Sequence, residues 1–217
     1  MWLANLACLW IIGLVAAAAA LSGSIWTLEG LVPMNADGEG LVGAHVIAIQ
    51  WESFSFLPGF AIGTAAAALG GQYVGAGNEP MARRAVWTCV FLGMCVMGLL
   101  GIAFILWGRA FTSVVSDEPI YLNLVPDLLL ICGLMQIFFA ISMVIRQALR
   151  GLGDTMWVFW ITTISSYGVR LPVVWLLGVV LELGLAGVWI GLCGEMIIRA
   201  MLFMARFRWG GWASRTL

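Results

Sequence analysis

The chain has 217 residues, of which 63% are hydrophobic and only 10% charged, and its mean hydropathy is +1.04. Roughly 25% of residues are charged in a soluble domain, so this composition excludes a soluble fold. All ten basic residues are arginines dispersed along a chain of net charge −1, which argues against nucleic-acid binding.

Long apolar runs separated by short polar turns predict about six membrane-spanning helices. Because a helix crosses a bilayer of about 30 Å in about 20 apolar residues, the chain is long enough for roughly six crossings and no soluble domain. The expected fold class is all-α, a polytopic bundle that forms a single transmembrane lobe over residues 1–217. Its spans are expected near 2–21, 41–72, 85–107, 120–148, 156–180 and 184–205, followed by a short cytoplasmic tail, 206–217.

The first two apolar runs carry small residues for different reasons. The first ends in AAAAALSGS, which is typical either of a signal peptide or of a retained helix, and it lacks the basic segment that a signal peptide needs. A retained helix is therefore favoured. The second run repeats small residues every four positions, a spacing that lets two helices approach closely in lipid. These residues are Gly59, Gly63, Ala67 and Gly71.

The arginines predict the orientation in the membrane. One side of the six-span arrangement carries Arg83, Arg84, Arg146, Arg150, Arg206, Arg208 and Arg215, and the other side carries Arg109. Because short arginine-rich loops stay in the cytoplasm, the chain is expected to start inside and to end with a cytoplasmic C-terminus. We expect a multi-pass protein in the lipid bilayer of the plasma membrane, with a bacterial inner membrane favoured.

The turn RQALRGLGDT, residues 146–155, joins the fourth and fifth spans. Arg146 and Arg150 are expected to anchor the cytoplasmic interface, and Gly151 and Gly153 are expected to permit the chain reversal. Asp154 or the threonine after it is expected to cap the following helix. The sequence therefore predicts a cytoplasmic turn at this point.

The GLGD string inside this turn resembles the signature around one catalytic aspartate of presenilin-type intramembrane proteases. That chemistry needs two carboxylates that share a proton. The nearest upstream membrane aspartate, Asp127, lies 27 residues before Asp154, which is roughly 40 Å along a helix. Paired-histidine, Gly-x-Ser-x-Gly and Walker-type motifs are also missing, so the chain is not expected to be an enzyme.

Ionisable residues inside the spans are the candidates for binding substrate or a coupling ion. Each costs at least about 2.5 kcal/mol by insertion scales and is seldom kept without a role. The pairs Asp127 with Arg170, at similar depths on antiparallel helices, and Glu195 with Arg199, one helical turn apart, are expected structural ion pairs. A direct part in transport is the alternative for these four residues.

Glu52 differs from these residues because it lies near mid-bilayer with no basic residue at helical spacing. Such a carboxyl group suits a proton-linked or cation-linked site. Retention by hydrogen bonds from Ser53, Ser55 or a neighbouring helix is an equal alternative. Glu52 is therefore a candidate coupling residue.

Polar residues in the fifth span share one helical face and are expected to point into the bundle or a watery cavity. They are Thr162, Thr163, Ser166, Tyr167 and Arg170. Tyr167 and Arg170 are accordingly candidates for contacting substrate. Hydrogen bonding between helices is the alternative for this face.

Four segments resemble, in the same order, the C-terminal lobe of the multidrug and toxic compound extrusion (MATE) transporters. They are GLVGAHVIAIQWESFSFLPGFAIGTAAAALGGQYVGAGN at 40–78, SDEP at 116–119, RQALRGLGDT at 146–155, and GVWIGLCGEMIIRAMLFMARFRWGGW at 187–212. Any one string is a weak signal, but the ordered set at matching helix positions is specific. The resemblance covers nearly the whole chain from about residue 40.

The resemblance implies a twelve-helix exporter of two six-helix lobes, which expels organic cations and amphipathic compounds in exchange for protons or sodium ions by alternating access. This chain would be the C-terminal lobe, truncated within its first helix, and the N-terminal lobe would be its missing partner. Neither a cofactor nor a metal is implied beyond the coupling ion. Phe139 stands where sodium-coupled relatives commonly carry an acid, which argues against a sodium site of that kind.

Two alternatives to the exporter stay open. The first is a lipid-linked oligosaccharide flippase of the same superfamily, for which a cavity lined by arginines would be the sign. The second is a non-transporting membrane assembly protein or an inactive fragment, because the chain supplies only half of a transporter.

Overall fold

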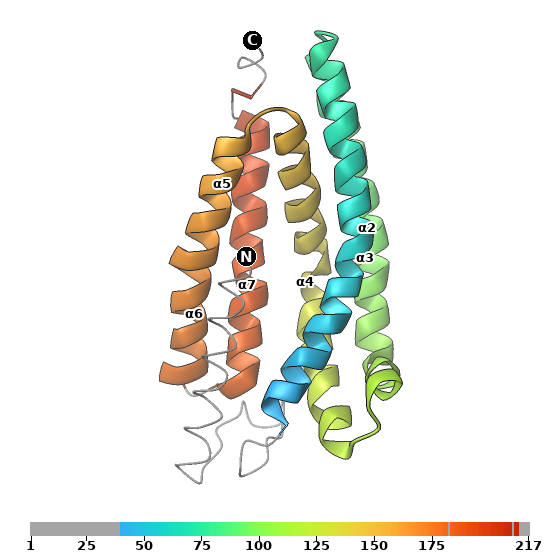
Figure 1. The fold of residues 1–217 in the computed structure, drawn as a ribbon, viewed down its shortest axis with the longest axis vertical. Coiled ribbons are helices and arrows are strands. Elements are labelled where there is room, and N and C mark those ends of the chain that lie inside the picture. Colours follow the sequence, from blue (N-terminus) through green and yellow to red (C-terminus); the bar gives the residue numbers. More distant parts are fainter. Residues whose placement is uncertain (1–39, 182, 210, 213–217) are drawn as a thin grey trace. The chain divides into compact units, whose positions relative to one another are not determined.

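A computed structural model describes residues 40–181, 183–209 and 211–212 (Figure 1). The expected span at 2–21 and half of the expected tail lie outside these residues. The described elements are α2 (Leu41–Gly75), α3 (Glu79–Val115), α4 (Pro119–Gly151), α5 (Thr155–Thr163), η1 (Ile164–Arg170), α6 (Leu171–Trp175), η2 (Leu176–Val180) and α7 (Gly184–Trp209). They form five helices that are long and apolar enough to cross a membrane, which confirms the all-α transmembrane fold class.

Several helices extend beyond the apolar runs that predicted them. Helix α3 starts at Glu79 instead of 85, where the Asn78 side chain accepts a hydrogen bond from the Met81 backbone N–H at 3.2 Å. Such a cap lets a helix begin in polar sequence. Helix α7 continues to Trp209, beyond the expected end of the sixth span at 205. Hydropathy marks the part of a helix that crosses lipid, while the backbone hydrogen bonds continue past it.

The turn after α4 has the hydrogen bonds of a Schellman cap. The Asp154 N–H donates to the Leu149 carbonyl at 2.9 Å, and the Gly153 N–H donates to the Arg150 carbonyl at 3.1 Å. Gly153 has a φ of +82°, which a side chain would disfavour, so its predicted role in the reversal fits the structure.

Two predictions about this turn are wrong. Gly151 is still helical, and a β-carbon there would clash with the backbone of Ala67, so its small size serves helix packing. Asp154 makes no side-chain cap at the start of α5 because an arginine on α7 binds its carboxylate instead.

The predicted fifth span, 156–180, is a chain of α-helical and π-helical segments. Two π-helical stretches, η1 and η2, flank the short α6, which begins next to Pro172. A π-helix has i→i+5 hydrogen bonds, so residues that share a face in an α-helix separate there. The π-helical hydrogen bonds therefore determine which polar side chains of this span are buried.

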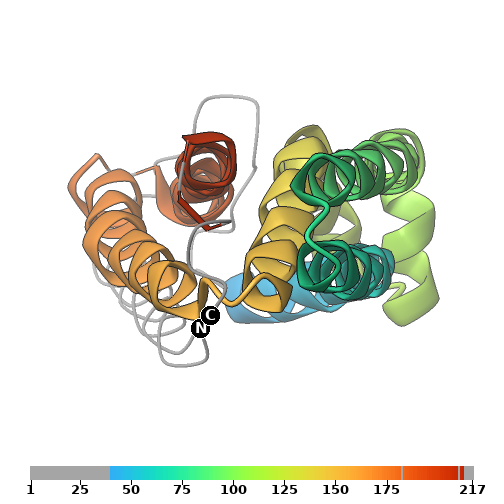
Figure 2. The same ribbon diagram turned by 90° about the horizontal axis from the view of Figure 1, so that it is seen from above.

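The described residues form two compact units, and every long helix contributes to both. Unit 1 contains residues 40–53, 101–134 and 166–195, and unit 2 contains 54–100, 135–165 and 196–212. Within unit 2, α5 lies beside the end of α7 in both views (Figures 1 and 2). The core of unit 2 includes Ala66, Val86, Val144, Leu149, Val158, Phe203 and Phe207. A single lobe over residues 1–217 stays a prediction.

Candidate functional site

Unit 1 holds a buried ion pair between Arg170, at the end of η1, and Glu195, on α7. The Arg170 Nη2 and Nε atoms donate to Glu195 Oε2 at 3.0 and 3.3 Å. Both residues are almost completely buried, with exposed fractions of 4% and 1%. Because each ion has lost most of its hydration, the pair depends on this geometry.

The Arg170 guanidinium is also within electrostatic range of a second carboxylate. Its charge acts on the Glu52 carboxylate of α2, and the charges of both residues act on the buried thiol of Cys193. Glu52 itself is half-buried. We call Glu52, Arg170 and Glu195 the unit 1 charge cluster. When all three residues are ionised, two negative carboxylates face one positive guanidinium. The excess of negative charge favours the binding of a cation.

The structure corrects one expectation about this cluster. The predicted pair of Asp127 with Arg170 is wrong, because Arg170 bonds Glu195 and Asp127 has no ion pair among the described residues. Similar depth in the membrane does not fix which way a helix face points, so depth alone could not select the partner. Glu52 has no basic residue at helical spacing, and the arginine whose charge acts on it comes from a different helix.

Arg199, on α7, lies in unit 2 and is 1% exposed. Its Nε atom lies 3.5 Å from the hydroxyl oxygen of Ser165, to which it donates. The predicted pair of Glu195 with Arg199 joins residues of the two units and stays a prediction.

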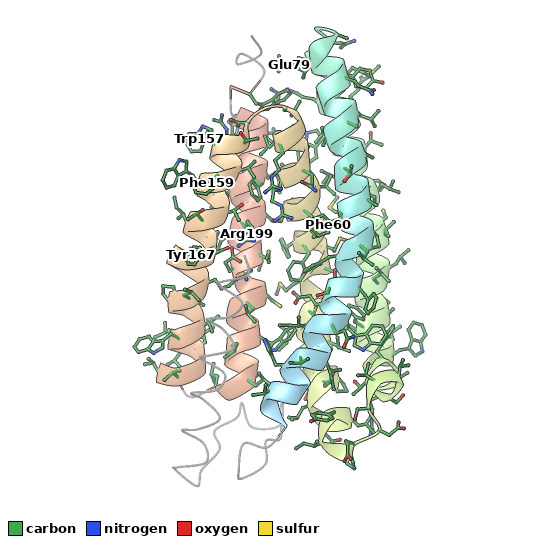
Figure 3. The ribbon with its side chains drawn as sticks, in the orientation of Figure 1. Phe60, Glu79, Trp157, Phe159, Tyr167 and Arg199 are labelled. Atoms are coloured by element: carbon green, nitrogen blue, oxygen red, sulfur yellow. The ribbon has the colours of Figure 1, made fainter. Side chains whose placement is uncertain are left out.

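The predicted polar face of the fifth span separates in the π-helical segment. Ser166 and Arg170 are buried, whereas Tyr167 is 40% exposed (Figure 3), so the residues of the predicted face do not all lie in the interior of the bundle. The α-helical period places Tyr167 with Arg170, whereas the i→i+5 pattern of η1 moves them to different faces. Sequence periodicity carries no signal for this change, and it also missed the buried Ser165 and Cys193.

His45 and Trp189 form a buried aromatic contact elsewhere in unit 1. Their ring centroids are 5.7 Å apart in an edge-to-face arrangement, and both side chains are at most 1% exposed. This contact connects α2 to α7, the two helices that supply Glu52 and Glu195. It therefore helps to position the two carboxylates of the cluster.

In unit 2 the turn between α4 and α5 binds the end of α7. Asp154 Oδ2 accepts a hydrogen bond from Arg206 Nε at 2.6 Å, and the Arg206 guanidinium lies 4.6 Å from the centre of the Trp157 ring. Trp157 and Phe159 project outward from α5 (Figure 3). Arg150 is exposed, whereas Arg146, the other residue predicted to anchor the interface, is only 6% exposed.

A second arginine in unit 2 binds the same end of α7. Arg83 bonds Glu79 at 2.9 Å and also donates to the backbone carbonyls of Phe207 and Arg208 at 3.3 and 3.4 Å. Its guanidinium lies 4.9 Å from the centre of the Trp212 ring. A cation at a helix C-terminus satisfies carbonyl groups that have no partner within the helix.

Comparison with known proteins identifies the family. Residues 34–176 match the family described as MatE. The chain is 33% identical over 173 residues to the probable multidrug resistance protein NorM of Thermotoga maritima, covering 80% of this chain and 37% of that protein. It is 31% identical over 202 residues to the probable NorM of Mesorhizobium japonicum, covering 91% and 42%. The chain thus spans less than half the length of these relatives.

Solved structures share the fold. The eukaryotic MATE transporter AtDTX14 superposes with a TM-score of 0.75 at 20% identity, covering 94% of this chain and 43% of that one. The MATE transporter ClbM, solved in complex with Rb⁺, also gives a TM-score of 0.75 at 20% identity, covering 95% and 47%. Together with the match over residues 34–176, these similarities show that the chain belongs to the MATE family, whose members are multi-pass membrane transporters and not enzymes.

Proposed function

We propose that this chain is the C-terminal lobe of a secondary active multidrug exporter, which exchanges organic cations or amphipathic compounds for protons or sodium ions. The relatives that carry the name multidrug resistance protein support this substrate class. The lobe would act with an N-terminal lobe by alternating access in the plasma membrane, with its C-terminus in the cytoplasm.

The observation that carries the proposal is the buried pair of Arg170 with Glu195, with the Glu52 carboxylate within electrostatic range of Arg170. Glu195 makes the direct hydrogen bonds and is almost completely buried, while Glu52 is half-buried. A proton, a sodium ion or an organic cation at Glu52 would balance the charge of the cluster. Glu52 would therefore be the exchanging carboxylate, and Glu195 would hold Arg170 in place.

In this arrangement the coupling ion and a cationic substrate compete for the Glu52 carboxylate, as antiport requires. When a cation occupies Glu52, the attraction between Glu52 and Arg170 falls, and Arg170 remains bound to Glu195 alone. When the cation leaves, Arg170 again stabilises both carboxylates. The proposal assigns Tyr167, which is exposed on η1, and Asp127, which is half-buried on α4, to substrate contacts.

The test is drug efflux by Glu52→Gln, with the full chain co-expressed with the N-terminal lobe of a NorM relative in efflux-deficient bacteria. Glu118→Gln removes the same charge from an exposed site of unit 1 and is the matched control. We expect Glu52→Gln to abolish ion-dependent efflux of ethidium at unchanged expression, and Glu118→Gln to preserve it. Unchanged efflux in Glu52→Gln would remove Glu52 from the mechanism.

The unmodified chain also distinguishes the alternatives. If it inserts into the membrane but moves no cation, alone or with the N-terminal lobe, it is an inactive fragment or an assembly protein. Movement of a lipid-linked oligosaccharide without cation efflux would instead support the flippase.

A further inference from the structure

The chain contains a single histidine, His45, whose side chain is completely buried in unit 1. Within the part of the chain that the structure describes, neither its Nδ1 nor its Nε2 atom has a hydrogen-bond partner. The indole Nε1 of Trp189, whose ring centre lies 5.7 Å from that of His45, is buried and unpaired in the same way. Buried polar atoms are normally bonded to protein or to ordered water, so three of them in contacting rings need an explanation.

Packing alone does not account for a histidine at this position. An apolar ring could make the same edge-to-face contact with Trp189 without taking two polar nitrogens out of water. A neutral imidazole has one nitrogen that donates and one that accepts, so it can take up a proton on one side of the ring and release a proton from the other. The chemistry of the buried ring therefore suits proton transfer.

His45 and Glu52 share a face of α2. They are seven residues apart in continuous α-helix, which is about two turns and roughly 10 Å along the axis. Ala48, which lies between them near this face, is buried and carries only a methyl group. A direct hydrogen bond cannot cover this distance, whereas a short chain of bridging waters can.

The predicted orientation puts His45 on the outer side of Glu52. Helix α2 begins at Leu41, and its start faces the outside when the arginine-rich end of the bundle is cytoplasmic. A coupling proton that enters from the outside would therefore pass His45 before it reaches Glu52.

We propose that His45 transfers the coupling proton from the outer side to Glu52, an inference that rests on the function proposed above. One ring nitrogen accepts a proton from a hydronium ion, which leaves as water. The imidazolium then releases the proton of its other nitrogen through bridging water to the Glu52 carboxylate, and the ring returns to its neutral form. The Trp189 N–H positions the water beside His45.

The other titratable groups of unit 1 that are not exposed determine where the proton goes. In the described part of the chain they are Glu52 on α2, Tyr121, Asp127 and Cys132 on α4, Arg170 on η1, and Cys193 and Glu195 on α7. Tyrosine and cysteine side chains are ordinarily neutral near pH 7, and Glu195 is bonded to Arg170. Glu52 is the carboxylate on the same helix face as His45, so it is the acceptor in this proposal.

The test separates proton-driven transport from cation exchange. It uses proteoliposomes that contain the full chain together with the N-terminal lobe of a NorM relative. One arm measures tetraphenylphosphonium transport driven by a pH gradient. The other measures exchange of labelled for unlabelled tetraphenylphosphonium at equal pH, which requires the Glu52 carboxylate but no net movement of protons. The variants are His45→Gln and Glu52→Gln, and the matched control is Gln50→Asn, an exposed polar side chain of α2.

We expect His45→Gln to slow proton-driven transport about a hundredfold at unchanged KM, as for the loss of a positioned proton-transfer group, and to leave cation exchange unchanged. Glu52→Gln should abolish both activities, and Gln50→Asn should change neither. Equal losses of both activities in His45→Gln would show a structural role and overturn the proposal. Wild-type rates of both in His45→Gln would overturn it as well.

Failure of this proposal can be told apart from failure of the proposed function. If the unmodified chain exchanges tetraphenylphosphonium but does not respond to a pH gradient, the coupling ion is not a proton. This outcome would overturn the role of His45 and leave the exchange at Glu52 intact. Wild-type exchange by Glu52→Gln would instead remove the proposed function, and the role of His45 with it.

A measurement on the unmodified chain covers the case in which His45→Gln does not fold. Because the chain contains one histidine, ¹⁵N-labelled histidine reports on His45 alone when the purified full chain is studied by NMR in phosphatidylcholine nanodiscs. We expect the ring N–H to exchange with D₂O within minutes, since the proposal requires water at the ring. Protection of this N–H for many hours, as in a dry core, would overturn the proposal.

Discussion

The two units are built from the same helices but have opposite charge. Among the described residues, unit 1 carries Glu52, Asp117, Glu118, Asp127 and Glu195 against Arg109 and Arg170, whereas in unit 2 arginines outnumber carboxylates. In unit 1 one arginine bonds one acid and is within electrostatic range of a second, and in unit 2 each acid is bound by an arginine while further arginines remain. Each long helix thus contributes one segment to the acidic unit and one segment to the basic unit.

The ion pairs of the two units also differ in burial. The side chains of Arg170 and Glu195 are 4% and 0% exposed, those of Arg206 and Asp154 are 15% and 1% exposed, and those of Arg83 and Glu79 are 35% and 45% exposed. Removal of one partner costs most where the other charge remains desolvated. Three substitutions, one in each ion pair, therefore rank the pairs by how much each one contributes to stability.

Arg170→Gln should have the largest effect. It leaves Glu195 without the hydrogen bonds that hold it in the interior, so the free energy of unfolding should fall by about 3–5 kcal/mol. Denaturant titration in detergent, followed by tryptophan fluorescence, measures the change. The double variant with Glu195→Gln should recover part of the loss, and wild-type stability in Arg170→Gln would mean that the pair does not hold unit 1.

Asp154→Asn should have an intermediate effect in unit 2. It removes the carboxylate that accepts the 2.6 Å hydrogen bond from Arg206, but Arg206 is partly hydrated and keeps its contact with Trp157. A fall of about 2 kcal/mol in the same titration is expected for one charge-assisted hydrogen bond. A loss as large as that of Arg170→Gln would erase the proposed difference between the units.

Glu79→Gln should have the smallest effect. Its pair with Arg83 is well exposed, and such pairs contribute about 0–1 kcal/mol. Arg83 also keeps its bonds to the carbonyls at the end of α7. Stability should change by less than about 1 kcal/mol and depend on salt, and a larger, salt-independent change would show that surface and buried pairs are equivalent here.

The features that sequence predicted are those with local causes. Apolar runs located five described spans because the bilayer requires them, and the Gly153 reversal follows from glycine's access to positive φ. The cost of intramembrane charge also selected Glu52, Arg170 and Glu195 as candidates before any contact was known.

The features that sequence missed depend on how helices face one another. Asp127 and Arg170 have compatible depths, yet Arg170 faces Glu195. The π-helical register of η1 exposes Tyr167, and no propensity or period in the sequence marks this segment. The position of Asp154 just before α5 predicts a helix cap. Its carboxylate instead binds Arg206, which lies 52 positions later in the chain.

The bonds from Arg83 to the end of α7 have a consequence for biosynthesis. The Arg83 side chain and the Phe207 carbonyl are separated by 124 residues. At about 5–20 residues per second, a ribosome needs roughly ten seconds to produce the second partner after the first. During this interval α3 is in the membrane without these two carbonyl acceptors for Arg83, so this contact forms only after α7 is synthesised. Premature termination before that helix would leave an insertion intermediate for quality control to remove.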